Sequence, residues 1–292
     1  MRTAPSVPVL GVEDLTEKVF VDEYVSHSRP CIIRGAIKHW PALQKWRDAA
    51  YLKQRCGHHQ NFVIPHEYHL SLKRFDVGKR IMAFGDALDY VQAPDTKAAM
   101  FATGSLVELA PDTAGLRFLR KTEPALTYPA LRYFFYRNAG TTWHFHTFDE
   151  TLMCQVIGAK KVGLLKVDGT SQKAVHDIFL AESYYDDPTA FDRADTAGLQ
   201  WFEATLDVGD ALFIPQLWWH GICPLDSAFG LTVASCWRSP LPVLARSITR
   251  MASGEIQMVG MRGEVEEFKR IWNVALTLGL QDALFAAWKR GL

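Results

Sequence analysis

The feature that most constrains the fold is a dense run of short strand-like segments in the middle of the chain. They are rich in β-branched and aromatic residues, and turn residues separate them. The segments are residues 133–137, 143–148, 152–157, 160–167, 199–206, 211–214, 220–223 and 230–237. Many short strands with turns between them predict a barrel or sandwich. We therefore expect a mainly β domain.

Helical patterns flank this region on both sides. Apolar residues recur at helical spacing in residues 12–25, 49–56 and 85–91. Between them, residues 31–34 and 61–64 read as short strands. Residues 98–110 also read as a strand, and Asp112 is expected to cap a short helix that ends at Arg120. Residues 168–198 are acidic and irregular, and we expect them to form a long insertion over the mouth of the barrel.

Two prolines, Pro240 and Pro242, suggest a boundary near residue 240. We expect residues 1–240 to form one domain that includes the N-terminal helices, and residues 241–292 to form a helical extension. The extension contains helical patterns at 265–278 and 281–289 with many apolar side chains. An apolar surface of this kind on a terminal appendage predicts a homodimer contact within residues 243–292.

The charge balance disfavours a nucleic-acid partner and gives no sign of a membrane partner. The chain has 32 basic and 32 acidic residues among 292, so its formal net charge gives no general attraction to nucleic acid or to an anionic membrane. Five cysteines at irregular spacing predict reduced thiols. The N-terminus lacks an apolar core typical of a secretory signal, and no apolar run is long enough for a membrane span. We expect a cytoplasmic protein.

Two histidines stand in the second strand of the dense run. His144 and His146 are separated by one residue, so both side chains would lie on one face of a strand. Glu150 follows four residues after the second histidine. Imidazole suits iron, zinc, copper and nickel, and a carboxylate can complete such a site. Because the neighbouring residues are aromatic, burial of two imidazoles here would be costly unless they bind a metal or a hydrogen-bond partner.

A later segment, residues 209–220, supplies a third histidine. It begins with a turn at Gly209 and Asp210, continues as an apolar strand, bends at Pro215 and ends at His220. We expect the scaffold to bring His220 to the earlier pair and to complete a metal site. The other histidine pairs, His58 with His59 and His66 with His69, have no such partner in the sequence and are predicted to be loop residues.

These segments resemble the motifs of the cupin superfamily. More narrowly, they are similar to the cupin-like JmjC group of Fe(II)- and 2-oxoglutarate-dependent oxygenases. The His-x-His pair with its glutamate resembles the first cupin motif. The second motif, Gly-x5-Pro-x4-His, is matched within residues 209–220. The residues that fit the JmjC-like pattern are Thr141, His144, Gln155, Val156, Gly158, Lys160 and the whole run 209–220. With an early segment at residues 29–36, the resemblance spans about residues 12–238.

The resemblance implies a double-stranded β-helix, also called a jelly-roll or cupin barrel, with α-helices at both ends. It implies Fe(II) held by His144, His146 and His220, with 2-oxoglutarate and O2 as co-substrates. In the cupin pattern Glu150 would be a fourth ligand, and in the JmjC-like pattern it would instead stand near the co-substrate. A solvated turn residue is the third alternative for Glu150.

The resemblance also implies a co-substrate pocket. Lys160 would pair with the distal carboxylate of 2-oxoglutarate, and Thr141 would donate its hydroxyl to the same group. This agrees with the chemistry of the residue, because a lysine that enters a barrel needs an anion. Thr151 would contact the co-substrate, and Ser235 and Trp237 would line its pocket, although core packing explains Trp237 nearly as well.

One residue departs from the group's pattern, because the acidic metal ligand is His146 here. Three hypotheses therefore stay open. The first is an Fe(II)- and 2-oxoglutarate-dependent hydroxylase that acts on a peptide or protein side chain or on a small molecule. The second is a three-histidine cupin dioxygenase or isomerase, with or without Glu150 as a ligand, that binds its substrate directly at the metal. The third is a metal-binding cupin without turnover. Lys160 and Thr141 favour the first, whereas His146 and Glu150 favour the second.

Overall fold

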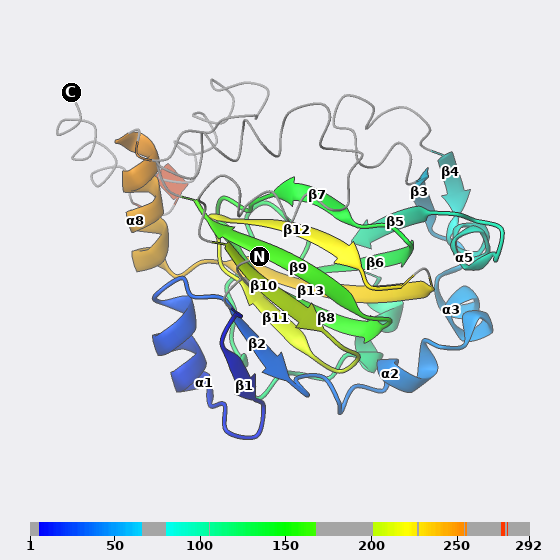
Figure 1. Ribbon diagram of the computed structural model, residues 1–292, viewed down its shortest axis with the longest axis horizontal. Helices are drawn as coiled ribbons and strands as arrows, with labels where there is room; N and C mark the ends of the chain where they lie inside the picture. Colours follow the sequence, from blue (N-terminus) through cyan, green and yellow to red (C-terminus); the bar gives the residue numbers. More distant parts are fainter. Residues whose placement is uncertain are drawn as a thin grey trace, which may run out of the picture.

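The computed structural model describes residues 6–65, 80–104, 106–167, 201–226 and 228–253, with residues 255, 276, 277 and 279. Two β-sheets form the body of these residues (Figure 1). The larger has the order β1-β2-β11-β8-β13-β6-β5-β3-β4, and the smaller has the order β10-β9-β12-β7. The predicted mainly β, jelly-roll architecture is confirmed.

Most bounds of the strands follow the sequence patterns, but the predicted strand at 143–148 is wrong, because one strand ends at His144 and the next begins at Asp149. In the larger sheet they are β1 (Val9–Gly11), β2 (Cys31–Arg34), β3 (Gln60–Pro65), β4 (Arg80–Ala83), β5 (Ala99–Gly104), β6 (Leu131–Arg137), β8 (Asp149–Ile157), β11 (Ala211–Ile214) and β13 (Phe229–Arg238). In the smaller sheet they are β7 (Thr141–His144), β9 (Lys160–Lys166), β10 (Trp201–Leu206) and β12 (Trp218–Pro224).

Helices lie at the two ends of the sheets. Figure 1 shows α1 and α8 at one end and α2, α3 and α5 toward the other. The helices are α1 (Glu17–Val19), which continues directly as the π-helix η1 (Phe20–Val25), α2 (Ala42–Lys45), α3 (Ala49–Cys56), α5 (Phe84–Gln92), the 3-10 helix η3 (Val107–Asp112) and α8 (Leu241–Ala252). Flanking helices at both ends were expected from the sequence.

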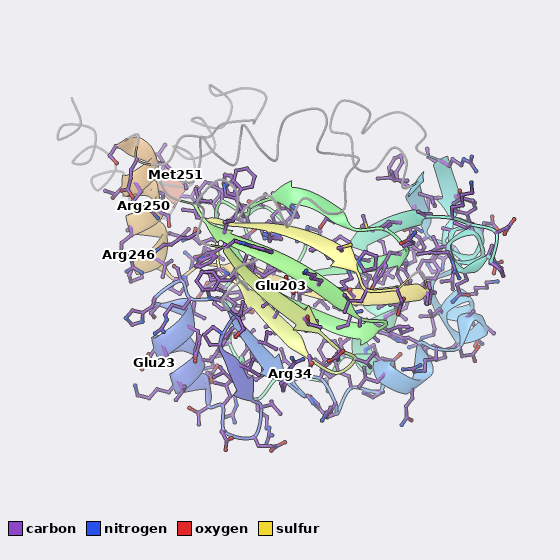
Figure 2. All side chains as sticks on the ribbon, in the orientation of Figure 1. Glu23, Arg34, Glu203, Arg246, Arg250 and Met251 are labelled. Atoms are coloured by element: carbon purple, nitrogen blue, oxygen red, sulfur yellow. The ribbon has the colours of Figure 1, made fainter. Side chains whose placement is uncertain are left out.

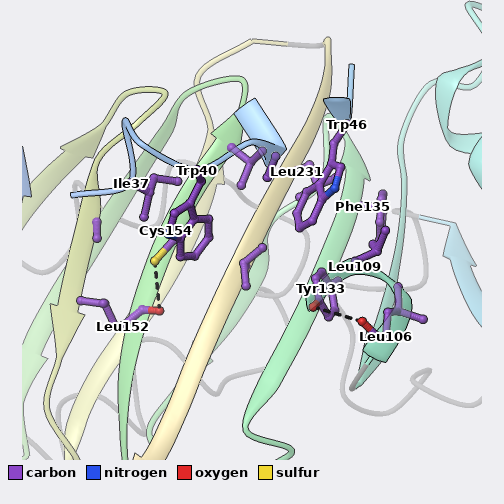
Figure 3. Close-up of a cluster of buried hydrophobic side chains, with 14 of the residues drawn as sticks. Ile37, Trp40, Trp46, Leu106, Leu109, Tyr133, Phe135, Leu152, Cys154 and Leu231 are labelled. Carbon is purple, nitrogen blue, oxygen red and sulfur yellow. Dashed lines mark hydrogen bonds between the residues drawn. The ribbon is translucent and has the colours of Figure 1, made fainter. Parts of the chain in front are cut away.

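The main hydrophobic core fills the space between the larger sheet and the N-terminal helices. Figure 3 shows Trp40 and Trp46 of the N-terminal region above strand residues such as Tyr133 and Phe135. Phe135 stacks on Phe101 with a centroid separation of 4.7 Å. A second cluster, from β2, β8 and β11 on one side and β9, β10 and β12 on the other, joins the two sheets. The sheets are therefore packed on one another as well as on the helices.

Helix α8 is held by polar contacts to residues next to the sheets and to the end of η1. Arg246 donates to the Ser26 carbonyl at 2.6 Å, and Arg250 donates to the Val167 carbonyl at 3.0 Å; Figure 2 labels both arginines. The Ser247 hydroxyl accepts a hydrogen bond from the Gln216 side chain at 2.7 Å. The helix begins one residue after Pro240, as the predicted extension does. The division into two domains stays a prediction.

Two further local predictions need correction. Residues 98–110 are not one strand, because β5 ends at Gly104 and the 3-10 helix η3 begins at Val107. Asp112 ends that helix and caps none. Its buried carboxylate accepts hydrogen bonds from Trp46 Nε1 at 2.9 Å and Tyr51 Oη at 2.6 Å, and it pairs with Lys45. A buried carboxylate needs these partners, so Asp112 joins η3 to the α2–α3 region.

Several predictions fall outside the described residues. They are the insertion at 168–198, the histidines at positions 66 and 69, the helices at 265–278 and 281–289, and most of the dimer contact within 243–292. In the part of the chain that the structure describes, no helix is both long enough and apolar enough to cross a membrane. All five cysteines are unpaired, as expected.

Candidate metal centre

Three histidines come together between the ends of the two sheets. His144 is the last residue of β7 and lies directly across from His220 on β12. The ring centroids of His144 and His220 are 4.1 Å apart, and His146 lies 5.4 Å from the first and 5.0 Å from the second. One ring nitrogen from each histidine lies within 4.8 Å of the other two. The predicted convergence is therefore present.

His146 reaches this centre in a different way from the one predicted. Strand β7 ends at His144, so His146 is not on the same strand face. Its carbonyl instead accepts a hydrogen bond from the Leu217 amide at 2.8 Å, just before β12 begins. At the other end of β7, Gly140 allows close approach to β12, because a Cβ there would lie 1.9 Å from the Ile222 carbonyl oxygen. Contacts with β12, rather than strand alternation, place the histidines.

Hydrogen bonds orient two of the rings. Nδ1 of His220 lies 2.9 Å from the Trp218 carbonyl oxygen and donates a hydrogen bond to it. This leaves the lone pair of Nε2 to bind a metal. Nδ1 of His146 lies 2.7 Å from the Thr151 hydroxyl. Nε2 of His146 is buried and has no hydrogen-bond partner among the described residues. An orphaned imidazole nitrogen beside two other histidines fits a metal ion.

Burial favours the neutral form of the His146 and His220 rings. It lowers the pKa of His146 well below its usual value, and the neighbouring His220 and His144 lower it further. Burial and His144 act in the same direction on the pKa of His220. Neutral imidazoles have the lone pairs that a metal requires, so the centre is ready to bind at neutral pH.

Glu150 lies outside the centre. Its Oε2 accepts from the Gln216 amide at 3.0 Å and its Oε1 accepts from the Ser239 hydroxyl at 2.5 Å. The donor set close enough to share one ion consists of the three histidines without it. Burial raises the pKa of Glu150 to about 7. We therefore assign Glu150 a structural role, joining β8 to the corner before β12, in place of the predicted ligand role.

A cavity opens beside the three histidines. Its walls also include Met100, Arg132, Phe134, Ala139, Gly140, Thr141, Thr151, Met153, Lys160, Ile222, Thr232 and Ala234. Three of the predicted co-substrate residues, Thr141, Thr151 and Lys160, are therefore brought together with the metal centre.

Lys160 is a buried amine in the cavity wall. It is 4 % exposed, and its Nζ lies 4.0 Å from the centroid of the Tyr136 ring. Burial lowers the pKa of Lys160 to about 7. No carboxylate of the described residues pairs with it, and the Thr141 hydroxyl is likewise buried without a partner there. A buried amine that pairs with no carboxylate of the described residues, beside a hydroxyl without a hydrogen-bond partner, indicates a ligand that would bind both groups.

Ser235 and Trp237 do not line the cavity. Strand β13 presents Thr232 and Ala234 to it, and side chains alternate along a strand. Trp237 belongs to the main core, where its ring stacks on Phe213 at 6.0 Å. The predicted pocket role of these two residues is corrected for this reason, because both lie on the opposite face of the strand.

Arg132 is a cavity residue that the sequence did not reveal. Its guanidinium carbon lies 4.1 Å from the centroid of the Tyr128 ring, and Tyr128 in turn lies 4.6 Å from the His146 ring. Nη2 contacts the Cys236 sulfur at 3.5 Å, and Nε is buried without a partner among the described residues. The only sequence signal was its place on β6, two and four residues before Phe134 and Tyr136 on the same face.

Comparison with known proteins agrees with this geometry. The sequence model of the cupin-like domain matches residues 16–241. The chain is 25% identical over 248 residues to lysine-specific demethylase 8 of Xenopus tropicalis, covering 77% of this chain and 54% of that protein. It is 27% identical over 235 residues to Jumonji C domain-containing protein 5 of Drosophila melanogaster, covering 73% and 56%. A short stretch of 27 residues, 9% of this chain and 8% of the other, is 63% identical to the human bifunctional peptidase and (3S)-lysyl hydroxylase JMJD7. The chain thus spans about half the length of the first two relatives.

Proposed function

The chain belongs to the cupin-like domain family, and from this premise we propose that it is a non-haem Fe(II)- and 2-oxoglutarate-dependent oxygenase. The JmjC-type relatives support an oxygenase at the level of the family, because their names include a demethylase and a hydroxylase. The observation that carries the proposal is a buried amine, Lys160, and a hydroxyl without a hydrogen-bond partner, Thr141, in the same cavity as the three histidines.

His144, His146 and His220 would hold the iron. Bound iron would activate O2, so that 2-oxoglutarate is converted to succinate and CO2 while one oxygen atom enters a C–H bond of the substrate. The protein orients the ligands through the Trp218 carbonyl and the Thr151 hydroxyl. Such hydrogen bonds fix the ring orientation of ligating histidines.

Lys160 and Thr141 would hold the distal carboxylate of 2-oxoglutarate. The Tyr136 ring, which faces Lys160, is held by a hydrogen bond from the Gln155 side chain at 2.9 Å. Gly230 lies opposite Tyr136 on β13 and leaves room for the ring, since a Cβ there would lie 2.1 Å from it. The amine has a lowered pKa, so we expect Lys160 to take up a proton when the carboxylate arrives, because a buried ammonium needs an anion.

Arg132 suggests the chemistry of the substrate. It lies four residues from Tyr136 along β6, and four strand residues span about 13 Å, so Arg132 and Lys160 stand toward opposite ends of the cavity. Relative to a site with two histidines and a carboxylate, His146 and Arg132 make this site more positive. Among the described residues that line the cavity there is no Asp or Glu. We therefore propose a substrate, either an acidic peptide side chain or a small molecule, that presents a carboxylate to Arg132.

One observation favours a second candidate. Three histidines without a carboxylate are also a suitable centre for a cupin dioxygenase or isomerase that binds its substrate directly at the metal. In that case the cavity cations would contact the substrate itself, and 2-oxoglutarate would have no role.

Succinate formation tests the proposal. The protein is loaded with Fe(II) without oxygen, mixed with 2-oxoglutarate and then exposed to O2, and succinate is quantified. We expect slow succinate formation even without a substrate, and none in the His144→Ala variant, because that variant lacks a metal ligand. Succinate at the same rate in both proteins, or none in either with iron bound, would contradict the proposal.

A further inference from the structure

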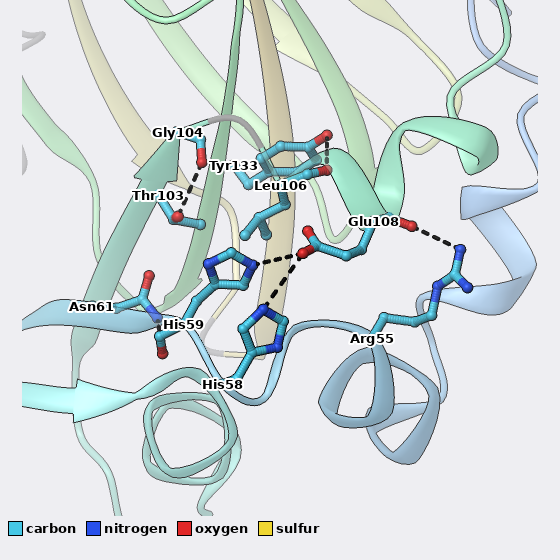
Figure 4. A network of polar contacts seen from close by, with 9 residues as sticks. All are labelled: Arg55, His58, His59, Asn61, Thr103, Gly104, Leu106, Glu108 and Tyr133. Carbon is cyan, nitrogen blue, oxygen red and sulfur yellow. Dashed lines mark hydrogen bonds and ion pairs between the residues drawn. The ribbon is translucent and has the colours of Figure 1, made fainter.

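A second group of metal-binding side chains lies away from the cavity. His58 and His59 follow the C-terminus of α3, and Glu108 lies in the 3-10 helix η3 (Figure 4). One donor atom from each of these residues lies within 4.8 Å of the other two. Figure 4 shows both imidazole rings directed at the same carboxylate oxygen.

One of the two distances lies within the spacing of ligands around a tetrahedral ion, and the other is slightly shorter. Glu108 Oε1 lies 3.1 Å from His59 Nε2 and 3.5 Å from His58 Nε2. Nitrogen and oxygen ligands bound to zinc at 2.0–2.2 Å would stand roughly 3.3–3.6 Å apart. A hydrogen bond to Glu108 explains the His59 contact, but 3.5 Å is long for a hydrogen bond from His58. A shared ion would account for both rings at once.

The backbones that carry these side chains are fixed in place. The His59 amide donates to the Cys56 carbonyl at 3.0 Å, and the His59 carbonyl accepts from the Phe84 amide at 2.7 Å. Arg55 donates to the Glu108 carbonyl at 2.8 Å (Figure 4). The three ligands would therefore need little reorganisation to bind an ion.

The carboxylate has capacity left for a ligand. Glu108 Oε2 is buried and has no hydrogen-bond partner among the described residues. The two histidine side chains are more accessible, with exposed fractions of 67% for His58 and 32% for His59. A metal could thus enter from the His58 side, and water could complete its coordination.

We propose that His58, His59 and Glu108 form a second binding site for a divalent transition metal, with Zn²⁺ as the best match. Two imidazoles and one carboxylate suit zinc with a fourth position open to water. The ion would join the turn between α3 and β3 to the helix η3. This site is separate from the three-histidine centre and does not depend on the proposed oxygenase activity.

Zinc titration of the full chain tests the proposal. The His144→Ala/His220→Ala variant removes the first centre, and calorimetry at pH 7.5 then measures Zn²⁺ alone. We expect one zinc per chain, with affinity reduced at least tenfold by a further His59→Ala or Glu108→Gln change. Affinity should also fall at pH 5.5, because both imidazoles must be neutral to bind. The exposed His58→Ala change is a second probe that spares the buried carboxylate.

A matched control comes from His27, another exposed histidine, whose Nδ1 lies 2.7 Å from the Asp22 carbonyl oxygen and which belongs to neither histidine group. His27→Ala should leave zinc binding unchanged. Thermal unfolding checks that each variant is folded, and zinc should raise the melting temperature of the parent but not of His59→Ala. The proposal is overturned by no zinc binding at 100 µM in the parent variant. It is also overturned if His58→Ala, His59→Ala and Glu108→Gln all bind zinc as the parent does.

Discussion

The two faces of strands β6 and β13 have different roles, although both are largely buried: one packs in the main core and the other lines the cavity. On one face, the side chains are apolar or have partners and belong to the main core: Tyr133, Phe135, Leu231 and Val233. On the other face, the side chains line the cavity: Arg132, Phe134, Thr232 and Ala234. The difference between adjacent residues of one strand is thus the difference between stabilising the fold and binding a ligand.

The cavity face is less stabilising than the core face when no ligand is bound. The cavity wall holds a buried amine at Lys160 and unpaired polar atoms at Thr141 and His146. Each costs free energy in the absence of a ligand. The core face has the opposite character, since Phe135 packs against Phe84 and Phe101 at 5.2 Å and 4.7 Å. Substitutions on the two faces should therefore have opposite effects on folding and binding.

The largest difference is expected between His220→Ala and Phe135→Ala. His220→Ala should abolish stoichiometric iron binding while the free energy of unfolding changes little, because a desolvated polar group is removed. Phe135→Ala should lower the free energy of unfolding by about 3–5 kcal/mol and leave the folded fraction able to bind iron. Metal analysis and urea unfolding measure the two effects. Full iron occupancy in His220→Ala would refute the site.

Lys160→Met should weaken 2-oxoglutarate binding by a factor of hundreds or more. Loss of one partner of a buried ion pair costs roughly 3–5 kcal/mol, and about 1.4 kcal/mol corresponds to tenfold in affinity. Calorimetry on the metal-loaded protein measures this. Lys161→Met is the control, because Lys161 points away and pairs with Glu203 at 2.7 Å. Equal losses in the two variants would contradict the assignment of Lys160.

The same Lys160→Met change should stabilise the protein when no 2-oxoglutarate is present. The folded-state pKa of Lys160 is lowered to about 7, so the unfolded chain holds the proton more tightly. The resulting destabilisation is complete below pH 7 and disappears as the pH rises toward the usual lysine pKa. We expect Lys160→Met to raise the free energy of unfolding by about 2–4 kcal/mol at pH 6, and by less at pH 9. A lower free energy of unfolding for Lys160→Met than for the wild type at pH 6 would contradict this prediction.

The pH dependence of 2-oxoglutarate binding is a smaller effect. Above pH 7 the free protein must take up a proton at Lys160 before it holds the dicarboxylate. The dissociation constant should therefore rise by up to about tenfold per pH unit between pH 7.5 and 9. Binding heats in buffers of different ionisation enthalpy would detect the proton uptake. A dissociation constant that is constant over this range would argue against a neutral amine.

Arg132→Gln is expected to have the smallest effect on the proposed reaction of 2-oxoglutarate. It should leave succinate formation from 2-oxoglutarate alone nearly unchanged. It should remove the stimulation that carboxylate-bearing compounds or acidic peptides give in the wild type. A panel of acids and amines, with succinate as the readout, measures this. Stimulation by amines but not by acids would contradict the proposed substrate chemistry.

Local sequence patterns were enough for much of this account. The helix at Ala49–Cys56 has the predicted bounds, and Asp48 caps it by accepting from the Ala50 amide. The run that ends at His220 does form a short buried strand and a corner before β12, since turn residues and apolar runs act over a few residues. The pairing of His220 with His144 followed from the same motifs.

Other features depend on the parity and pairing of strands. Ser235 and Trp237 were placed on the cavity face, but a shift of one residue moves every side chain of a strand to the other face. The place of Arg132 in the cavity wall depends in the same way on which face of β6 it occupies. The partner of His59 is Glu108, which is 49 residues away, so no local pattern could join them. The position of His146 depends on its contact with Leu217, which also joins residues far apart in the chain.

The most direct test of the central claim is an anaerobic titration of 2-oxoglutarate into the Fe(II)-loaded protein, followed through the visible metal-to-ligand charge-transfer band. If Lys160, Thr141 and the three histidines form one site, the band should grow to saturation at one 2-oxoglutarate per iron. It should be absent in Lys160→Met at the concentration that saturates the wild type. No band at millimolar 2-oxoglutarate in an iron-loaded, folded wild-type protein would contradict the account and favour a cupin that binds its substrate directly at the metal.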